Sequence, residues 1–170
     1  MHKLKTFNIA YITETSPDNK HAWSGTAHYA YISLKKQGHT VFALGPKYPK
    51  FIGFFCKIIN QLTLYFLKKR FDYRHSTIYS KAFGRLFSKE LHKLNYDIVV
   101  ICGGTEYGAY LKTSKPIYYI LDRTIEGALN YHPVLSNLLR FSEQQSILTD
   151  KTAMLNSSKT FFSSEWAANH

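Results

Sequence analysis

The chain has 170 residues, of which 45% are hydrophobic and 16% are aromatic. This is the size of one domain, and the apolar fraction is high enough for a packed core, which excludes a disordered chain. The formal net charge of +11 bears on partners rather than on fold, and nucleic acid, anionic lipid and phosphorylated substrates all fit it.

The sequence carries no pattern typical of a metal site, a disulfide framework or a secretion signal. Its two cysteines, Cys56 and Cys102, belong to no CxxC motif, so we expect neither bound zinc nor a disulfide scaffold. The first apolar run is short and interrupted, and no stretch reaches the roughly 18 apolar residues of a spanning helix. We therefore expect a cytoplasmic protein.

The first part of the chain predicts a strand–helix–strand unit. Phe7–Thr13 is a short apolar run of the kind found in buried parallel strands. A helix is predicted from Thr26 to about Gln37, and Gly38 ends it in the left-handed position. Thr40–Gly45 is the second strand.

The same alternation continues to the end of the sequence. The predicted elements are helices over 51–70 and 80–94, a strand over 97–102, a short helix around 106–111, a strand over 116–121, a helix over 135–155, a strand over 160–163 and a helix from 164. This order predicts an α/β fold with an open, mostly parallel Rossmann-like sheet and helices on both faces. The sequence ends one turn into the last helix, so we expect residues 1–170 to be one domain of a longer protein.

Polar and glycine residues follow four of the predicted strands, at the edge where open α/β sheets bind ligands. The segments are 14–26, 103–107, 122–126 and 163–166. In Trp23-Ser24-Gly25-Thr26, free N–H groups at the helix start suit a phosphate or a sugar hydroxyl. An ordinary turn with an N-cap explains these residues equally well. Neither GxGxxG nor GxxxxGK[ST] occurs, which disfavours a dinucleotide or P-loop site.

The later strand ends add further candidates. The turn Gly103-Gly104-Thr105 offers a second backbone nest, and a tight strand-to-helix turn is its alternative. Asp122, beside Arg123, is suited to accept a hydrogen bond from a sugar hydroxyl or to position an acceptor nucleophile; its alternative is a helix N-cap. Three histidines near these loops are candidates for substrate contact, with solvated or capping roles as the alternative: His21, His28 and His132.

Taken in order, these segments resemble the N-terminal half of bacterial retaining glycosyltransferases of the GT4 type (glycosyl transferase group 1). The resembling pieces are Trp23-Ser24-Gly25-Thr26, the run LKKQGHTV over 34–41, which is close to an L...GH.V pattern, YDIVV over 96–100, YILD over 119–122 and FSSEWAA over 162–168. They span nearly the whole chain.

This resemblance implies a GT-B fold, in which the active site lies in a cleft between two Rossmann-like domains. Residues 1–170 would be the acceptor-side domain, without the C-terminal domain that holds most of the nucleotide-sugar. Gly25 would approach the donor phosphate, and Ser164 and Glu165 would belong to the substrate site. Asp122 would take the catalytic position at a strand end, where many relatives have a histidine. The resemblance implies no metal or other cofactor, and an acceptor that is a saccharide or lipid-linked, in cell-envelope polysaccharide or glycolipid synthesis.

The middle of the chain is both apolar and basic. A helix over Phe51–Arg70 places eight apolar side chains on one face: Phe51, Phe54, Phe55, Ile58, Ile59, Leu62, Tyr65 and Phe66. Such a helix can lie in a bilayer interface, where each basic side chain near anionic lipid contributes about 1 kcal/mol. The membrane contacts would then be Phe51, Phe54, Phe55, Lys57, Lys68, Lys69 and Arg70. The alternative is a helix packed on the sheet with solvated charges at its ends.

The sequence leaves several functions open. The leading one is the acceptor half of a retaining glycosyltransferase, with a nucleotide-sugar donor bound mainly by the missing domain and a peripheral position on the inner face of the cell membrane. The others are a non-catalytic membrane-docking subunit for a separate donor-binding chain and the N-terminal half of a sugar-nucleotide epimerase. Nucleic-acid binding is disfavoured, because the basic residues cluster around one apolar helix and no nucleic-acid motif occurs.

Overall fold

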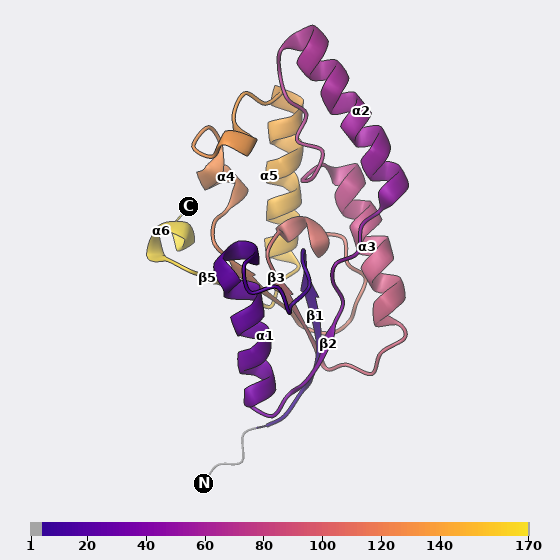
Figure 1. Cartoon of the computed structure of the whole chain (residues 1–170), viewed down its shortest axis with the longest axis vertical. Helices are drawn as coiled ribbons and strands as arrows, with labels where there is room; N and C mark the ends of the chain where they lie inside the picture. Colours follow the sequence, from indigo (N-terminus) through magenta and orange to yellow (C-terminus); the bar gives the residue numbers. More distant parts are fainter. Residues whose placement is uncertain (1–4, 170) are drawn as a thin grey trace.

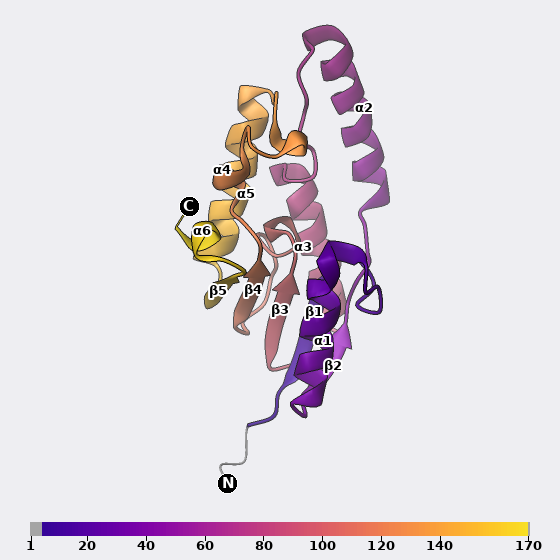
Figure 2. The same ribbon diagram turned by 60° about the vertical axis from the view of Figure 1, so that its left-hand side comes forward.

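The computed structural model describes residues 5–169. Five parallel strands form one sheet in the order β2-β1-β3-β4-β5, and this confirms the predicted α/β fold (Figures 1 and 2). The strands are β1 (Asn8–Thr13), β2 (Thr40–Ala43), β3 (Ile98–Cys102), β4 (Ile117–Leu121) and β5 (Lys159–Phe162). The order reverses between β1 and β3, which makes that edge the topological switch point where ligands bind in open α/β sheets.

The strand register brings three loops together at one edge. Thr13 pairs with Cys102, and Cys102 pairs with Ile120. The segments that follow β1, β3 and β4 therefore leave the sheet at nearly the same level. The expectation that these strand ends share one rim is confirmed.

Helices cover both faces of the sheet, as predicted. The longer helices are α1 (Thr26–Lys36), α2 (Lys50–Leu67), α3 (Thr77–Leu91) and α5 (Arg140–Leu155). The shorter ones are the 3-10 turns η1 (Ala22–Gly25), η2 (Thr105–Tyr107) and η3 (Pro133–Leu135), and the single-turn helices α4 (Ile125–Ala128) and α6 (Glu165–Ala168).

The two faces of the sheet have separate cores. On one face, α1 packs Ala27 against Ile9 and Tyr11 of β1. On the other face, α3 and α5 enclose the larger core, in which Phe83 and Phe87 are buried. Burial of this apolar surface is the main favourable term that holds the layers together.

Some predicted helices are shorter than expected. The short helix predicted around 106–111 is only the 3-10 turn η2, and the helix predicted over 51–70 ends at Leu67. The predicted helix over 135–155 begins at Arg140, because the segment before it is extended and lies beside the end of α2. There, Arg70 donates its backbone N–H to the carbonyl of Asn137, and Leu139 donates to the carbonyl of Arg70. Asn137 has a φ of 54°, which interrupts the helical conformation.

The middle helix α2 stands away from the sheet and lies beside α3 (Figure 2). Only Gly53 and Cys56 are buried along it. The eight apolar side chains predicted to share a face are all exposed, from 42% at Ile58 to 87% at Phe51. The alternative in which this face packs on the sheet is therefore wrong. Within residues 5–169, no helix is long and apolar enough to cross a membrane.

Candidate functional site

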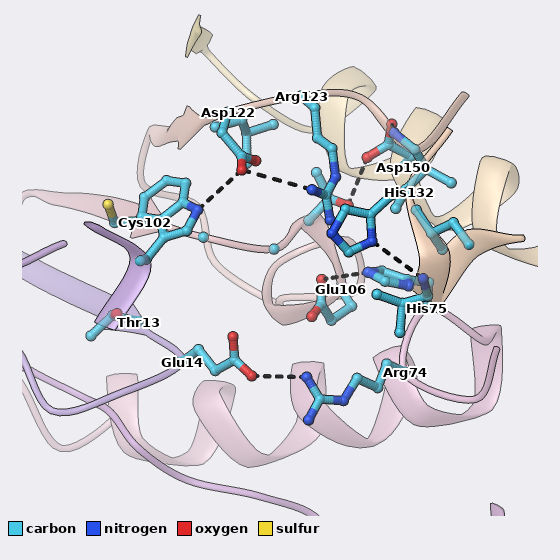
Figure 3. Close-up of a pocket in the computed structure, with 18 of the residues that line it drawn as sticks. Thr13, Glu14, Arg74, His75, Cys102, Glu106, Asp122, Arg123, His132 and Asp150 are labelled. Carbon is cyan, nitrogen blue, oxygen red and sulfur yellow. Dashed lines mark hydrogen bonds and ion pairs between the residues drawn. The ribbon is translucent and has the colours of Figure 1, made fainter. Parts of the chain in front are cut away.

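A pocket of about 490 Å³ lies at the carboxyl ends of β1, β3 and β4 (Figure 3). Its position at the switch point of the sheet is the one that the strand order favours for a ligand. Most of the candidates from the later strand ends line it together with one from the first loop: Trp23, Gly103, Gly104, Thr105, Asp122, Arg123 and His132.

Asp122 is held at the pocket by two side chains. Its Oδ2 atom accepts a hydrogen bond of 3.2 Å from the indole N–H of Trp23 and lies 3.9 Å from the guanidinium of Arg123. The N-cap of α4 is Thr124, whose Oγ1 accepts a hydrogen bond from the backbone N–H of Gly127. The helix-cap explanation of Asp122 is therefore wrong, and its half-exposed carboxylate faces the pocket.

An unusual backbone turn directs Trp23 toward Asp122. Trp23 and Ser24 both have a φ of 51°, and Gly25 follows with a φ of 79°. Left-handed residues other than glycine are uncommon, and such strain persists where the surroundings hold it in place. A side chain at Gly25 would also meet Tyr29 at 2.9 Å and the carbonyl of Lys20 at 3.0 Å. Gly25 therefore shapes the turn.

Several predicted substrate contacts do not line this pocket. They are Ser24, Gly25, Thr26, Ser164 and Glu165. Ser164 is the N-cap of α6, since its hydroxyl oxygen accepts a hydrogen bond from the N–H of Ala167. Of the three histidines predicted to contact substrate, His132 lines the pocket and the other two do not. His28 is buried, with Nδ1 2.7 Å from the carbonyl oxygen of Pro17, and His21 lies in the exposed loop.

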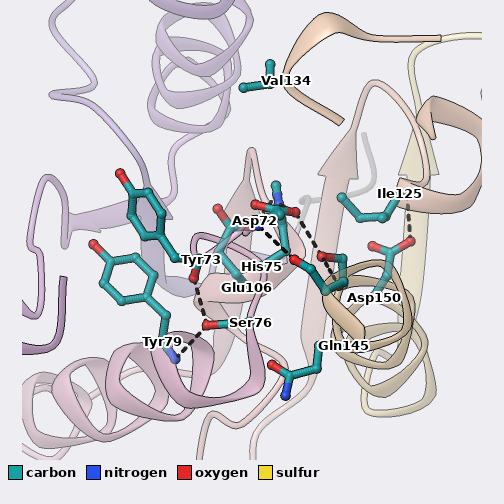
Figure 4. A network of polar contacts seen from close by, with 12 residues as sticks. Asp72, Tyr73, His75, Ser76, Tyr79, Glu106, Ile125, Val134, Gln145 and Asp150 are labelled. Carbon is teal, nitrogen blue, oxygen red and sulfur yellow. Dashed lines mark hydrogen bonds and ion pairs between the residues drawn. The ribbon is translucent and has the colours of Figure 1, made fainter. Parts of the chain in front are cut away.

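A buried group of acids and one histidine forms the floor of the pocket (Figure 4). His75 lies before α3, with Nδ1 2.7 Å from Oδ2 of Asp72 and Nε2 3.8 Å from Oε2 of Glu106. Asp72 Oδ2 also accepts a hydrogen bond of 2.8 Å from the hydroxyl of Ser146 on α5. These contacts join three segments that are far apart in the sequence.

The charges of this group follow from its contacts. Burial works against the protonated imidazole, but the charge of Glu106 and the hydrogen bond to Asp72 raise the pKa of His75 to about 9. For Asp72, burial is outweighed by the contact with His75, and its pKa is lowered. Asp72 and His75, whose side chains are 8% and 17% exposed, thus form a largely buried ion pair at neutral pH.

For Glu106 and Asp150, the cost of burying the carboxylate is not fully offset by their contacts. Burial raises the pKa of Glu106, and its Oε2 atom has no hydrogen-bond partner. A side chain at Gly104 would contact this carboxylate and require Glu106 to move. Burial also raises the pKa of Asp150, against hydrogen bonds from the Thr105 hydroxyl at 2.7 Å and the Ile125 N–H at 3.0 Å.

Little in the sequence indicates this group. Glu106 lay inside a segment already selected for its glycines, but Asp72 and His75 sit just after the basic stretch, in no recognisable motif. Their partner Ser146 is 74 residues away from Asp72. The one local signal that could indicate this pair is the three-residue spacing between Asp72 and His75, which our predictions from the sequence do not use.

The pocket wall also holds a thiol and an exposed ion pair. Burial raises the pKa of Cys102 to about 11, so this side chain is a neutral thiol at physiological pH and a poor nucleophile. Arg74 Nη1 lies 3.0 Å from Oε1 of Glu14, with both side chains about half exposed. The pocket therefore presents cations and carboxylates together, a set suited to hydroxyl and phosphate groups.

Comparison with known proteins adds no assignment. A scan of known protein families and a search of curated protein sequences both find no match for the chain. Across residues 5–169, no three His, Cys, Asp or Glu side chains are grouped so that they could hold a metal ion. The case for a function therefore depends on the pocket and on the surface around it.

Proposed function

We propose that this chain is the acceptor-binding half of a retaining glycosyltransferase of the GT-B type. It would act on a nucleotide-sugar donor and a saccharide or lipid-linked acceptor, together with a second domain that binds most of the donor. The observation that carries the proposal is the half-exposed carboxylate of Asp122, held by Trp23 and Arg123 at the switch-point rim of a parallel sheet.

The chemistry of the rim suits sugar transfer. An ionised carboxylate accepts hydrogen bonds from sugar hydroxyls and can orient an acceptor nucleophile. The guanidinium groups of Arg74 and Arg123 line the same pocket and are suited to negative charge on a phosphate. The glycine turn after β3, with Gly103 at a φ of 129°, brings backbone close to whatever occupies the pocket.

Asp122→Asn in the full natural protein tests this proposal, because the amide keeps the shape of the side chain and removes its charge. We expect turnover of a nucleotide-sugar panel, followed as released nucleoside diphosphate, to fall by about 100-fold or more. The thermal midpoint should stay unchanged. Asp18→Asn, an exposed acid in the neighbouring loop, is the matched control.

Two results would contradict the transferase. Wild-type turnover in Asp122→Asn would remove the carboxylate from the reaction. An isomerised nucleotide-sugar that accumulates without any acceptor would instead favour the sugar-nucleotide epimerase with the same fold.

We further propose that the protein lies peripherally on an anionic membrane, as part of the enzyme or as a docking subunit. The exposed apolar face of α2 supports this, together with Lys57, Lys68 and Lys69 around it. Arg70 contributes less to membrane binding than we expected from the sequence, because its guanidinium donates a hydrogen bond of 2.8 Å to the carbonyl of Pro133.

Vesicle co-sedimentation measures this association. Changing Lys57, Lys68 and Lys69 together to Glu should lower partitioning onto phosphatidylglycerol vesicles by at least about 100-fold, because three cations worth about 1 kcal/mol each are lost and the new carboxylates are repelled. The matched control changes three exposed lysines away from α2 to Glu: Lys89, Lys112 and Lys115. Equal pelleting with neutral phosphatidylcholine vesicles would rule out the electrostatic part.

A further inference from the structure

A second hollow lies between the first half of α2 and the body of the protein. It has a volume of about 460 Å³, and we call it the α2 groove. Its walls are aromatic and basic, with Tyr48, Phe54 and Tyr73 among the aromatic residues. The α2 groove adjoins the pocket at the carboxyl ends of β1, β3 and β4, which we call the rim pocket, because Glu14, Arg74 and Glu106 line both. The ion pair between Glu14 and Arg74, which Figure 3 shows, therefore lies where the two hollows meet.

The sequence of α2 explains the shape of the groove. Lys50, Gly53, Phe54 and Lys57 line it, and these positions share one side of a helix because they are spaced by three, four and seven residues. Gly53 is the point of close approach, where a side chain would meet Tyr79 of α3 at 3.2 Å. Beyond this point α2 extends past the end of α3, as Figure 1 shows.

The groove carries a surplus of positive charge. Three cationic side chains line it, those of Lys50, Lys57 and Arg74. Of its two carboxylates, that of Glu14 is paired with Arg74, and that of Glu106 is buried with a raised pKa. In addition, the sequence holds no Asp or Glu from residue 19 to residue 71. Such a site favours a phosphate, which bonds to both lysine and arginine.

The groove also has an apolar exit. Phe54 lines the groove and belongs to the exposed face of α2, where it is 63% exposed beside Phe55. The face continues along the helix to Tyr65 and Phe66, which are exposed to a similar extent. An exposed apolar surface of this kind marks an interaction site, and a hydrocarbon chain fits it.

We propose that the α2 groove and the rim pocket together bind a single lipid that carries a phosphate. The phosphate lies among Lys50, Lys57 and Arg74, and the hydrocarbon tail follows the exposed face of α2 into the bilayer. The head group beyond the phosphate reaches the rim pocket beside Asp122. For the transferase proposed above, on which only this last step rests, the acceptor is then a lipid-phosphate-linked molecule and not a free saccharide.

A second copy of the chain is a poorer occupant of the same face. Two α2 faces brought together would place Lys57, Lys68 and Lys69 of each copy around one apolar contact, with no acidic residue of α2 to compensate them. Like charges held together in this way oppose association. An anionic lipid surface complements the same cations.

Monomeric decyl phosphate, used below its micelle concentration, tests the groove by titration calorimetry. We expect saturable, stoichiometric binding that is about 100-fold tighter than that of inorganic phosphate, because the tail contributes apolar burial. Lys57→Gln and Arg74→Gln should each weaken it by about 10-fold, the loss of one charged contact. Lys89→Gln, on the exposed surface of α3, is the control and should bind like the wild type.

Three results would overturn the proposal. Equal affinity for decyl maltoside would show a general apolar patch without a phosphate site. Unchanged binding in Lys57→Gln, whose exposed side chain is not needed for folding, would place the phosphate elsewhere. Concentration-dependent dimerisation that is abolished by Phe51→Ser with Phe55→Ser would assign the face to a second copy.

These experiments distinguish a failure of the lipid-site proposal from a failure of the transferase proposal. Decyl phosphate binding needs no sugar donor, and Asp122→Asn should bind the probe as tightly as the wild type. If Asp122→Asn keeps full turnover while the lysine and arginine variants lose the probe, the lipid site stands and the transferase falls. If turnover depends on Asp122 but no variant affects the probe, the lipid site falls alone.

Discussion

The neighbouring helices α2 and α3 have similar apolar patterns, but the apolar face of α3 is buried and that of α2 is exposed. Phe83 and Phe87 of α3 are each 1% exposed, whereas Phe51 of α2 is 87% exposed. The difference lies in the small residues between the large ones. Gly84 lets α3 lie against the carbonyl of Tyr110, and the hydroxyl of Ser80 donates to the carbonyl of Glu106. On α2, only Gly53 and Cys56 give comparable close contact.

The charges around the two helices differ in the same way. Near the end of α3, Glu90 binds Lys47 at 2.7 Å and Lys93 at 2.9 Å, so opposite charges are balanced within the domain. The cations of α2 have no acidic neighbours on their own helix. An amphipathic pattern therefore identifies a face that is suited to burial, while the small residues and the charges around it indicate what can cover that face.

The largest predicted effect is on stability, and it compares one phenylalanine from each helix. Phe83→Ala should lower the free energy of unfolding by about 3–5 kcal/mol, because the change leaves a cavity among Tyr79, Phe87 and Tyr107. Phe55→Ala should change it by no more than about 0.5 kcal/mol, since the ring is 63% exposed. Urea titration followed by far-ultraviolet circular dichroism measures both.

One result with these two variants would contradict the comparison of the helices. If Phe55→Ala destabilises the monomer as much as Phe83→Ala, the apolar face of α2 packs against the rest of the domain in solution. That result would remove the surface on which both membrane association and lipid binding depend.

Much of the fold could be predicted from sequence, because each central strand is a continuous apolar run between polar loops. The runs in β1, β3 and β4 predict strands for this reason, and parallel pairing then places Gly103 and Asp122 at one rim. The predicted start of α5 is wrong because Leu138 and Leu139 continue an apolar pattern across the point where the chain pairs with Arg70. Local periodicity does not reveal such a long-range contact.

The candidate site was predictable only in part, for a related reason. Trp23 and Asp122 were each chosen from their own loops, and their contact follows from strand order. The pair of Asp72 and His75 depends on Glu106 and on Ser146 of α5, which come from other parts of the chain. Buried polar groups of this kind acquire their partners only when the tertiary structure forms.

The smaller predicted effect is a pH dependence of stability that belongs to His75. Its folded pKa of about 9 lies above the unfolded value near 6.5, so its contribution is fully present below about pH 6.5 and is lost as the pH rises through about 9. The shift corresponds to about 3 kcal/mol. The lowered pKa of Asp72 has the opposite sign, so its contribution is lost as the pH falls below about 4.

His75→Gln, compared with the wild type in urea at about pH 6 and about pH 10, isolates this contribution. Other groups also lower the stability of the protein as the pH rises. They are the two acids near His75 with raised pKa values, Glu106 and Asp150, and the buried thiol of Cys102. The difference between the two proteins removes what they share. We expect a gap of about 3 kcal/mol at the lower pH that narrows toward the higher one. His92→Gln, at the exposed end of α3, should follow the wild type. A gap that does not vary with pH would instead mean that the pKa of His75 is the same in the folded and unfolded protein.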